Sequence, residues 1–400
     1  MNESRPEPDR RLRIAVLHRI FVSSGGGAER YAIALVEHLS QRHEVHVFAQ
    51  EIGHQSRGVT YHKVSTPLRR PRWINQLWYA FATWRATREG FDIVHSHENT
   101  WHGNVQTVHV LPVWHNFFAG RTGVRLLLRQ IKAWTSPRMW TYLGLESSRF
   151  SVPTTRGGSG VRRLIVVTSE PVRKVMLKTF PKSALALRVL TPGVELPSDS
   201  VPNGQLSLTR EQARRQLGVP ADSPCVLFIG NDFGKKGLPS LLKALAKLPA
   251  DAVLLAIGSA QRIPAFRTMA DDLGLGNRVI LQGALKDISI AYRCADVLAH
   301  PTLEDTFAMV VLEAMAHGLP VVVSDESYCG IASMLTDGVD AVILPYPKDH
   351  GAIANALNAV LGKALYRKAL SEKAFEFASH HTWAAKTKVQ EAMYFELLDD

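Results

Sequence analysis

Two acidic side chains with seven residues between them stand out in the stretch AHPTLEDTFAMVVLEAMAHGLP at residues 299–320. The pattern places Asp305 in a loop and Glu313 about two turns into the helix that follows. A carboxylate such as Glu313 suits the paired hydroxyls of a ribose, and one in the loop suits the hydroxyls of a sugar. Taken alone, two such acids are more often solvated charges. The first turn of the same helix would supply backbone N–H groups to a phosphate, at Phe307, Ala308 and Met309.

A lysine pair lies in the turn GNDFGKKG at residues 230–237, between an expected strand and an expected helix. Lys235 and Lys236 at the start of a helix can neutralise a diphosphate. The turn differs from a Walker P-loop, because only three residues separate its first two glycines and no Ser or Thr follows the lysines. A Walker-type Mg²⁺ site is therefore disfavoured. The alternative is a solvated lysine pair on a loop.

A glycine cluster in the first half of the chain, Gly25, Gly26 and Gly27, also lies between a strand and a helix. Glycines there let backbone N–H groups approach an anion at the helix N-terminus. A dinucleotide-binding turn would need a further glycine where Arg30 stands, so NAD binding is disfavoured. A tight loop without a ligand is the alternative.

Five histidines fall within 21 residues of the first half. They are His95, His97, His102, His109 and His115. A metal cluster is conceivable, but a strand sends its side chains to opposite faces and should separate them. We therefore expect isolated core or surface imidazoles and no metal site.

The elements that must position these side chains alternate between strand and helix. Residues 13–17 and 44–49 have the composition of strands, and residues 31–39 between them have the apolar spacing of a helix. This order predicts a parallel sheet. Further strands of the first half are expected at 92–95, 104–110, 163–168 and 187–190.

A second series of the same kind occupies the other half of the chain. Its strands are expected at 225–230, 252–258, 279–281, 297–300 and 320–324, and its helices at 238–248, 287–295 and 306–316. We therefore expect an α/β protein of two Rossmann-like, doubly wound domains that face each other across a cleft. The boundaries are residues 1–195, a polar linker at 196–210, residues 211–383, and a C-terminal helix at 384–400 that is a candidate to pack back on the first domain.

The basic charge of the chain is concentrated in its first half. The 400 residues contain 47 Lys and Arg against 36 Asp and Glu, a formal charge of +11. Residues 1–200 carry +14, from 28 basic and 14 acidic residues, whereas residues 201–400 carry −3, from 19 and 22. Residues 99–145 contain no acid, and seven of the eight tryptophans lie between Trp73 and Trp140.

Arginine together with tryptophan is typical of a membrane interface. We expect the segment at about 63–145 to face an anionic membrane or a phosphorylated lipid, through Arg121, Arg125, Arg129 and Trp134. A basic, solvated face over an aromatic core is the alternative. Nucleic acid would require similar residues, but no nucleic-acid motif is present, so no nucleic-acid partner is expected.

Composition also excludes several classes of protein. With 46% hydrophobic and 21% charged residues, the chain is not disordered, collagen-like or a coiled coil. Three widely spaced cysteines do not form a disulfide framework and indicate a reducing compartment. The polar N-terminus is unlike a secretory signal, and no run of 18 apolar residues is present. We expect a cytoplasmic protein, which would bind a membrane peripherally through the basic, Trp-rich segment.

Together these motifs resemble the retaining family-4 glycosyltransferases of GT-B fold over nearly the whole chain. Several weak motifs in the family's order are more specific than any one of them. They are GGGAER (25–30), TVH (107–109), VTSEPVRK (167–174), LTPGVE (190–195), FIGNDFGKKG (228–237), AYRCADVLAHPTLED (291–305) and the acid pair of 305–313. Within the family, GNDFGKKG and HPTLEDTFAMVVLEA look most like the lipopolysaccharide core glucosyltransferases that act on inner-core heptose.

The resemblance implies that the second domain holds a nucleotide sugar and the first an acceptor. It implies catalytic roles for Asp305 and His109 near the donor sugar and for Lys236 at the diphosphate. Glu313 would hold the ribose, and the glycine loop would lie near the diphosphate and the acceptor. The full donor-binding set that we expect is Gly26, Gly27, Lys235, Lys236, Ala308, Met309 and Glu313.

The sequence departs from the family's pattern at three places. Asp305 stands where the family usually has Glu, Thr306 and Ala308 stand where glycines are common, and Asn231 replaces a common arginine. Asp keeps the charge but shortens the reach, so Glu304 is an alternative functional acid.

The chemistry that the resemblance implies needs no metal or other cofactor. Lysines and a helix N-terminus would stabilise the departing nucleoside diphosphate. The transition state would be oxocarbenium-like, and the acceptor hydroxyl would attack on the same face, with retention. We expect a hexosyltransferase that moves glucose from UDP-glucose, or a related UDP-hexose, to a lipid-linked glycan such as the lipopolysaccharide core. The alternatives are another donor such as GDP-mannose for an O-antigen or capsule, a catalytically silent GT-B glycan-binding protein, and a nucleic-acid-binding protein.

Overall fold

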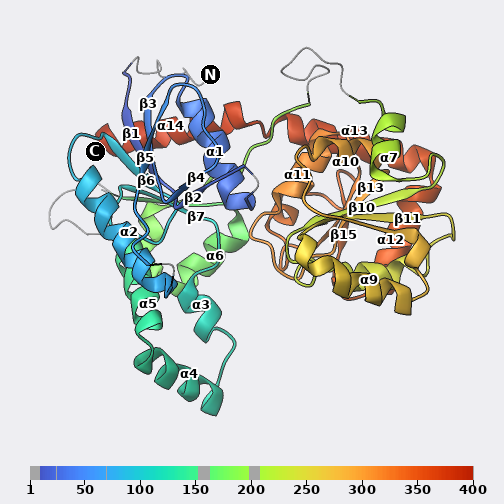
Figure 1. Cartoon of the computed structure of the whole chain (residues 1–400), viewed down its shortest axis with the longest axis horizontal. Helices are drawn as coiled ribbons and strands as arrows, with labels where there is room; N and C mark the ends of the chain where they lie inside the picture. Colours follow the sequence, from blue (N-terminus) through green and yellow to red (C-terminus); the bar gives the residue numbers. More distant parts are fainter. Residues whose placement is uncertain (1–9, 24, 69, 152–162, 198–207, 400) are drawn as a thin grey trace. The chain divides into compact units, whose positions relative to one another are not determined.

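The chain forms two compact units, each built around a parallel β-sheet (Figure 1). The computed structural model describes residues 10–23, 25–68, 70–151, 163–197 and 208–399. The first unit comprises Met1–Thr168, Arg173–Leu190 and Thr387–Asp400, and the second comprises Ser169–Val172 and Thr191–Lys386. The prediction of two Rossmann-like α/β domains is confirmed. Most of the expected linker lies outside the described residues, and helix α7 (Arg210–Leu217) begins at its last residue.

The sheet of the first unit has seven parallel strands in the order β5-β3-β1-β6-β7-β8-β9. In that order the strands are Val59–Lys63, Glu44–Ala49, Arg13–Leu17, Ile93–Ser96, Val105–Val108, Leu164–Val167 and Leu187–Val189. A two-stranded sheet pairs β2 (Ile20–Phe21) with β4 (Glu51–Ile52). The helices of this half are α1 (Gly27–Leu39), α2 (Arg72–Thr87), α3 (Val113–Phe118), α4 (Gly123–Thr135), α5 (Pro137–Phe150), α6 (Glu170–Thr179) and the 3₁₀ helix η1 (Pro181–Ala186).

The central strands of this sheet are buried because helices cover both faces, as is usual for a parallel sheet. All four residues of β8 are buried, as are the last four of β1. Helix α1 adds an apolar face that includes Ile33, Val36 and Leu39. It begins at Gly27, four residues earlier than the apolar spacing predicts, because the glycine turn leads directly into it.

The C-terminal helix α14 (Trp383–Asp399) contributes its residues from Thr387 onward to the first unit. Glu391 is buried and lies 3.0 Å from both Arg42 and His43. The hydroxyl of Tyr394, also buried, lies 2.6 Å from Nδ1 of His95. The last helix of the chain therefore completes the core of the first unit.

The sheet of the second unit has six parallel strands in the order β12-β11-β10-β13-β14-β15, the doubly wound order of a Rossmann domain. In that order the strands are Val279–Gln282, Val253–Gly258, Cys225–Gly230, Val297–His300, Val321–Ser324 and Val342–Leu344. Besides α7, the helices are α8 (Leu238–Leu245), α9 (Ile263–Asp272), α10 (Ser289–Cys294), α11 (Met309–Ala316), α12 (His350–Gly362) and α13 (Ala364–Ser379). The 3₁₀ helices are η2 (Ala260–Arg262), η3 (Gly276–Arg278) and η4 (Gly330–Met334).

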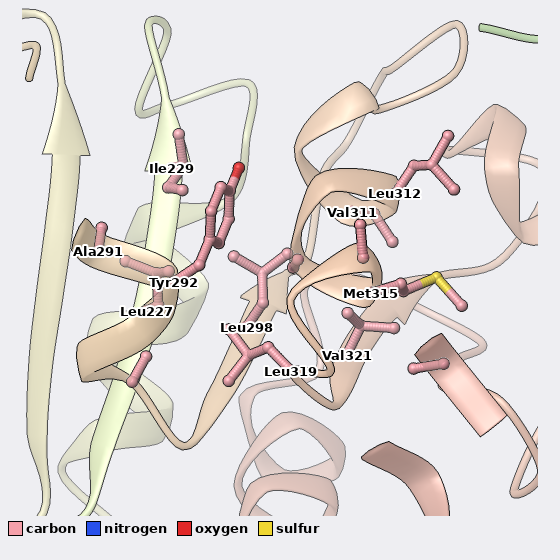
Figure 2. Close-up of a cluster of buried hydrophobic side chains, with 14 of the residues drawn as sticks. Leu227, Ile229, Ala291, Tyr292, Leu298, Val311, Leu312, Met315, Leu319 and Val321 are labelled. Atoms are coloured by element: carbon pink, nitrogen blue, oxygen red, sulfur yellow. The ribbon is translucent and has the colours of Figure 1, made fainter. Parts of the chain in front are cut away.

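Helices α10 and α11 pack their apolar sides on this sheet and form one of its two cores (Figure 2). The contributing side chains come from β10, β13 and β14 as well as from both helices. Among them are Leu227, Leu298, Val321, Ala291, Tyr292, Val311, Leu312 and Met315. This core fixes the start of α11, and therefore the loop that precedes it.

The strand order of the second sheet reverses between β10 and β13. At such a point the loops that follow the two strands diverge and leave a crevice at their carboxyl ends. The loop after β10 carries the lysine pair, and the loop after β13 carries Glu304 and Asp305. The topology therefore brings together two motifs that are distant in the sequence.

Two further properties concern the described part of the chain. None of its helices combines the length and the apolar character that a membrane-crossing helix needs. The three cysteines, Cys225, Cys294 and Cys329, are free thiols and are all buried.

Candidate functional site

The turn after β10 is built around a buried phenylalanine. Phe233 packs edge-on against Phe228 and Phe266, with ring centroids 5.9 and 5.2 Å away. The N–H of Lys236 donates to the carbonyl of Asp232 at 2.9 Å, which closes the turn. The apolar anchor and this hydrogen bond hold the lysine pair at the carboxyl end of β10.

Gly237 joins this turn to the loop that follows β13. It has φ +87°, and a Cβ atom there would lie 1.9 Å from the carbonyl oxygen of Pro301. Both the backbone conformation and the close approach require glycine. The N–H of Leu303 donates to the carbonyl of Lys235 at 2.8 Å and links the two loops again.

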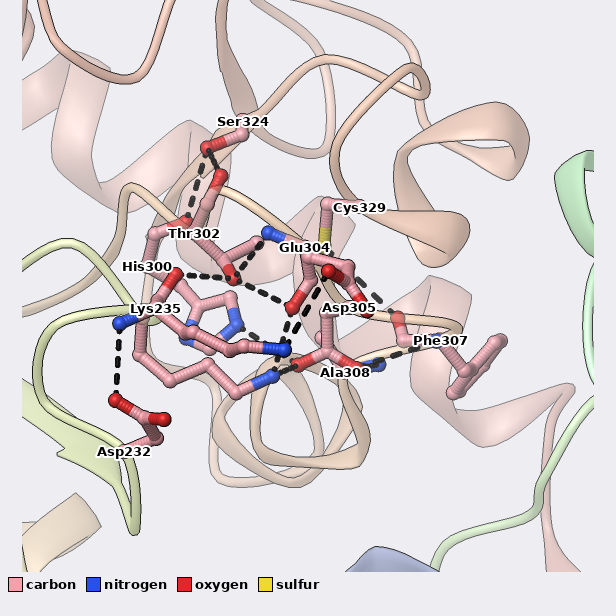
Figure 3. A network of polar contacts seen from close by, with 11 residues as sticks. Asp232, Lys235, His300, Thr302, Glu304, Asp305, Phe307, Ala308, Ser324 and Cys329 are labelled. Carbon is pink, nitrogen blue, oxygen red and sulfur yellow. Dashed lines mark hydrogen bonds and ion pairs between the residues drawn. The ribbon is translucent and has the colours of Figure 1, made fainter. Parts of the chain in front are cut away.

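The carboxylate of Asp305 lies at the centre of this region and contacts four donors (Figure 3). Its Oδ2 accepts from Nζ of Lys236 at 2.6 Å and from Nε2 of His300 at 3.2 Å. Its Oδ1 accepts from the N–H groups of Phe307 and Ala308, at 3.3 and 2.9 Å. The side chain is only 16% exposed. These contacts fix its orientation and join three segments of the chain.

The two ionisable partners of this cluster keep Asp305 charged. Burial alone would raise the pKa of Asp305, but the hydrogen bond from His300 and the charge of Lys236 outweigh it and hold that pKa well below its usual range. Burial lowers the pKa of His300, against the opposing effect of Asp305. His300 is therefore neutral at pH 7, with its proton on Nε2, where Asp305 accepts it.

Ala308 has φ +73° and ψ +69° and is the one non-glycine residue with positive φ in the described part of the chain. This left-handed residue precedes α11, so the helix begins at Met309 and not at 306 as the sequence pattern suggests. It also explains why glycine is common at this position of the family's motif. The N–H groups of Phe307 and Ala308 are engaged by Asp305, whereas the sequence led us to expect them to be open to phosphate.

Unlike Asp305, the side chain of Glu304 is half exposed. Its carboxylate lies 3.5 Å from Nζ of Lys235, with 51% and 60% of the two side chains exposed. A pair of this kind contributes little stability and remains adaptable. The backbone carbonyl of Glu304 accepts from Nζ of Lys236 at 3.1 Å.

Glu313 lies on α11, as the sequence predicts, and is half buried. Its Oε2 accepts a hydrogen bond of 2.7 Å from the hydroxyl of Tyr292 on α10. Sequence reasoning missed both Tyr292 and His300. The sequence pointed to both residues, because both belong to the motif AYRCADVLAHP. His300 also ends β13, one of the two strands between which the strand order of the sheet reverses.

In the first unit, the histidines gather at the ends of β1, β6 and β7. The rings of His95 and His97 stack with centroids 4.4 Å apart, and those of His97 and His109 with centroids 5.1 Å apart. Nδ1 of His97 lies 2.8 Å from Nε2 of His109. The expectation that the strand would separate these side chains is wrong, because His95 on β6 and His97 directly after it are two residues apart and share a face. Among the residues that the structure describes, no group of three or more His, Cys, Asp or Glu side chains is placed to hold a metal ion.

The glycine turn of the first unit caps α1 with its backbone. Gly26 is the N-cap residue and Gly27 the first residue of the helix. Glu29 lies in the first turn of α1, and a Cβ atom at Gly26 would be 3.1 Å from its Oε2. The chain's own carboxylate therefore lies at the helix end where the sequence predicted an external anion.

The histidine group predicts a loss of stability in acid. Burial lowers the pKa of His95 to about 3 and those of His97 and His109 well below the ordinary value. As the pH falls below about 6.5, the unfolded chain binds protons at these positions and the folded chain does not. We expect the free energy of unfolding to fall by about 1.4 kcal/mol per pH unit for each of the three, reaching this slope well below pH 6.5.

Urea unfolding followed by tryptophan fluorescence measures this, because seven of the eight tryptophans lie in the first unit. A free energy of unfolding that stays constant between pH 7 and pH 5 would contradict the prediction.

The left-handed residue before α11 gives a second prediction. Replacing Ala308 by glycine should stabilise the second unit by about 0.5–1 kcal/mol, because a Cβ atom is unfavourable at this φ. Ala308→Val should destabilise it by more than that amount. The measurement is urea unfolding of each variant followed by circular dichroism. A stable valine variant would show that the turn adopts another conformation.

Two family models match consecutive parts of the chain. Residues 25–197 match the family described as Glycosyltransferase Family 4, and residues 209–377 match Glycosyl transferases group 1. The second match contains Lys236, Asp305 and Glu313.

The curated relatives point to two kinds of glycosyltransferase. The lipopolysaccharide glucosyltransferase WaaG of Escherichia coli is 28% identical over 225 residues, which are 55% of this chain and 57% of that protein. The D-inositol 3-phosphate glycosyltransferase of Mycolicibacterium smegmatis is 32% identical over 246 residues, 60% of this chain and 54% of that protein. The matched part thus spans about half of the length of these relatives.

Solved structures match nearly the whole chain. The crystal structure of WaaG superposes with a TM-score of 0.78 at 20% identity, and covers 95% of this chain and 99% of that one. Anabaena Alr3699/HepE in complex with UDP-glucose superposes with a TM-score of 0.71 at 18% identity, and covers 96% of this chain and 99% of that one. The two family models together cover most of the chain, which therefore belongs to the family-4 glycosyltransferases, and the superpositions show that it has their GT-B fold.

Proposed function

We propose that the protein transfers glucose from UDP-glucose, or a related UDP-hexose, to a lipid-linked glycan, with the lipopolysaccharide core as acceptor. The name of the E. coli relative and the UDP-glucose complex of a structural neighbour support this choice. The observation that carries it is the fixed ammonium group of Lys236 at the strand-order reversal of the second sheet.

Lys236 is suited to a diphosphate because it is held before any ligand binds. A lysine ammonium has three N–H donors. Within the described residues, two of them are directed to Oδ2 of Asp305 and to the carbonyl of Glu304. The third is then available to an oxygen of the departing nucleoside diphosphate, with the more exposed Lys235 as a second cation. A preorganised donor of this kind stabilises the charge that develops as the glycosidic bond breaks.

The start of α11 contributes to the same subsite. Met309 and the residue after it lie in the first turn, whose N–H groups have no partner within the helix. In this proposal these two N–H groups bind the diphosphate, because Asp305 already engages the N–H groups of Phe307 and Ala308. Glu313, further along the helix, accepts hydrogen bonds from the ribose.

Asp305 and Glu304 have different roles in this proposal. A carboxylate offers about four lone-pair positions, and four donors already contact Asp305. We therefore assign Asp305 to positioning Lys236 and the start of α11. Glu304, which is half exposed, is the acid that can accept a hydroxyl of the donor sugar.

The remaining roles rest on the family resemblance. His109 would approach the donor sugar from the first unit, and Gly26 and Gly27 would lie near the diphosphate and acceptor. The acceptor hydroxyl would attack on the same face that the diphosphate leaves, through an oxocarbenium-like transition state, with retention. The charge stabilisation is assigned to protein groups and involves neither a metal ion nor a cofactor.

Helix α4 supports a membrane-bound acceptor. It packs against α3 and α5, away from the sheet of its own unit (Figure 1). Its exposed apolar side chains recur at intervals of three or four residues and so share one face. They are Val124, Leu127, Leu128, Ile131 and Trp134, each more than half exposed.

The basic residues near this face differ in their surroundings. Arg121 donates to the carbonyls of Asn116 and Phe117, and Arg129 lies over the ring of Phe117 at 4.8 Å. Arg125 and Lys132 lie on α4 beside the apolar face and are exposed. An apolar face flanked by basic residues is typical of a helix that lies in an anionic membrane surface. We propose that the protein is peripheral on the cytoplasmic face of the inner membrane.

A second candidate acceptor is a soluble, phosphorylated polyol, which the D-inositol 3-phosphate glycosyltransferases favour by their name. A GDP-sugar donor such as GDP-mannose, for an O-antigen or capsule intermediate, and a catalytically silent GT-B glycan-binding protein are further alternatives. A thermal-shift screen of UDP-, GDP- and ADP-sugars separates the donors. UDP release from UDP-glucose, with and without acceptor, separates an enzyme from a binding protein.

The central test replaces the lysine that faces the diphosphate. Lys236→Ala should lower kcat for UDP release from UDP-glucose by about a hundredfold or more, because a fixed donor to the leaving group contributes roughly 3 kcal/mol to transition-state stability. Since this change also removes a partner of Asp305, the double variant Lys236→Ala/Asp305→Asn should recover stability but not kcat. Lys243→Ala, exposed on α8, is the control. Near-normal turnover in Lys236→Ala would exclude its proposed role.

The membrane assignment is tested on α4. Leu127→Ser/Leu128→Ser should weaken binding to phosphatidylglycerol vesicles by about tenfold or more, since each leucine loses part of the roughly 1.5–3 kcal/mol that full burial provides. Arg125→Gln/Lys132→Gln should weaken it in a salt-dependent way, by about 1 kcal/mol per residue. Gln130→Ser is the matched control on the same helix. UDP affinity should stay constant in all three, and a parallel loss of UDP affinity would refute this separation of roles.

A further inference from the structure

The core of the second unit contains a tyrosine whose hydroxyl reaches the carboxylate of Glu313. Tyr292 is 3% exposed, and its ring lies among the apolar side chains of α10, α11 and the strands, with Leu298 and Val311 nearby (Figure 2). The hydroxyl points away from that cluster and donates to Oε2 of Glu313 at 2.7 Å. A buried tyrosine that is rigidly packed thus presents one fixed donor to an acid at the edge of the core.

His317 supports the ring of Tyr292 from a second side. The two rings stack with centroids 5.0 Å apart and an angle of 25° between their planes. His317 is the C-cap residue of α11, and its N–H donates to the carbonyl of Glu313. Burial, together with the charge of Arg293, lowers the pKa of His317 to about 4, against the opposing effects of Glu313 and Asp287. The imidazole is therefore neutral at pH 7 and adds no positive charge beside the carboxylate.

A carboxylate held in this way is suited to a pair of neighbouring hydroxyls. Glutamate has several rotatable bonds, and a ligand must otherwise order them when it binds. The hydrogen bond from Tyr292 orders the side chain in advance. A carboxylate can accept about four hydrogen bonds, so one donor and a pair of hydroxyls are within the capacity of such a group. The tyrosine donor thus orients the carboxylate of Glu313.

We infer that Tyr292 is a positioning residue that orients Glu313 toward both ribose hydroxyls, so that the site selects ribonucleoside diphosphates over deoxyribonucleoside diphosphates. A site built to pair with a hydroxyl discriminates strongly against an analogue that lacks it, because its own polar group is then left unpaired. The inference rests on the proposed role of Glu313 in the donor site. It adds a residue from α10 to that site and narrows the class of donor.

The test compares UDP with 2′,3′-dideoxy-UDP by isothermal titration calorimetry on the full chain. The wild type should bind UDP at least tenfold more tightly. Tyr292→Phe keeps the ring and its stacking on His317 and removes only the hydroxyl. It should weaken UDP binding about tenfold, which corresponds to about 1.4 kcal/mol, and leave the dideoxy nucleotide within twofold of the wild type. If GDP binds more tightly than UDP, the same comparison is made between GDP and 2′,3′-dideoxy-GDP.

Two controls separate this inference from the proposed function. Tyr366→Phe, a half-buried tyrosine on α13, undergoes the same chemical change away from Glu313 and should leave both affinities unchanged. Glu313→Gln should reduce the preference for UDP at least as much as Tyr292→Phe does.

If Tyr292→Phe weakens the binding of both nucleotides equally, or changes neither affinity, the proposed role of Tyr292 is overturned. Glu313→Gln still tests the role of Glu313 in that case. A Glu313→Gln variant that keeps the full preference would overturn the ribose assignment itself, and the positioning role with it. A wild-type protein that binds none of these nucleotides would overturn the inference together with the proposed function.

Discussion

The structure of the second unit depends on one buried negative charge, the carboxylate of Asp305. Its donors come from the turn after β10, from the end of β13 and from the start of α11. A buried charge is costly unless it is paired, so each of these segments restrains the other two. The geometry of the lysine turn is therefore a property of the folded chain and does not depend on a ligand to create it.

This constraint also links two departures from the family's usual sequence. A shorter acid keeps its carboxylate close to its own backbone, where it can accept from the N–H groups of Phe307 and Ala308. Those bonds require the chain to turn sharply before α11, and Ala308 does so in a left-handed conformation. The aspartate and the left-handed alanine thus belong to one local structure. The exposed Glu304 next to them is not constrained in this way.

The two units carry different polar groups at the points where the strand order of their sheets reverses. Both sheets reverse their strand order, between β1 and β6 in the first and between β10 and β13 in the second. The second unit places paired charges there. The first places stacked, neutral imidazoles there, although it carries the basic excess of the sequence. Much of that excess lies instead on the peripheral helices, including Arg125 and Lys132 of α4.

Sequence alone predicts the fold class and the most buried strands. The bounds of β1, β3, β10 and β13 agree with it, because continuous apolar runs mark strands that are covered on both faces. The edge strand β5 (VTYHK) was missed because it is polar and partly exposed. The basic residues of helix α2 suggest only a basic surface, whereas its buried face includes Tyr79 and Thr83.

The candidate site could be predicted in its parts but not in its connections. The spacing of Asp305 and Glu313 and the lysine pair are visible in the sequence. The ion pair between Lys236 and Asp305 is not, because it depends on which strands are neighbours in the sheet. The same is true of the contact between Tyr292 and Glu313, which joins two helices through the core.

The buried state of all three thiols has a practical consequence for spectroscopy. Thiol reagents react with accessible thiolates, so Cys225, Cys294 and Cys329 should remain unmodified in the native protein. The wild-type chain can then serve directly as the background for single-cysteine labelling. A fluorophore or spin label attached at one exposed position of α4 would report the depth and tilt of that helix at a lipid surface, without the removal of any native cysteine.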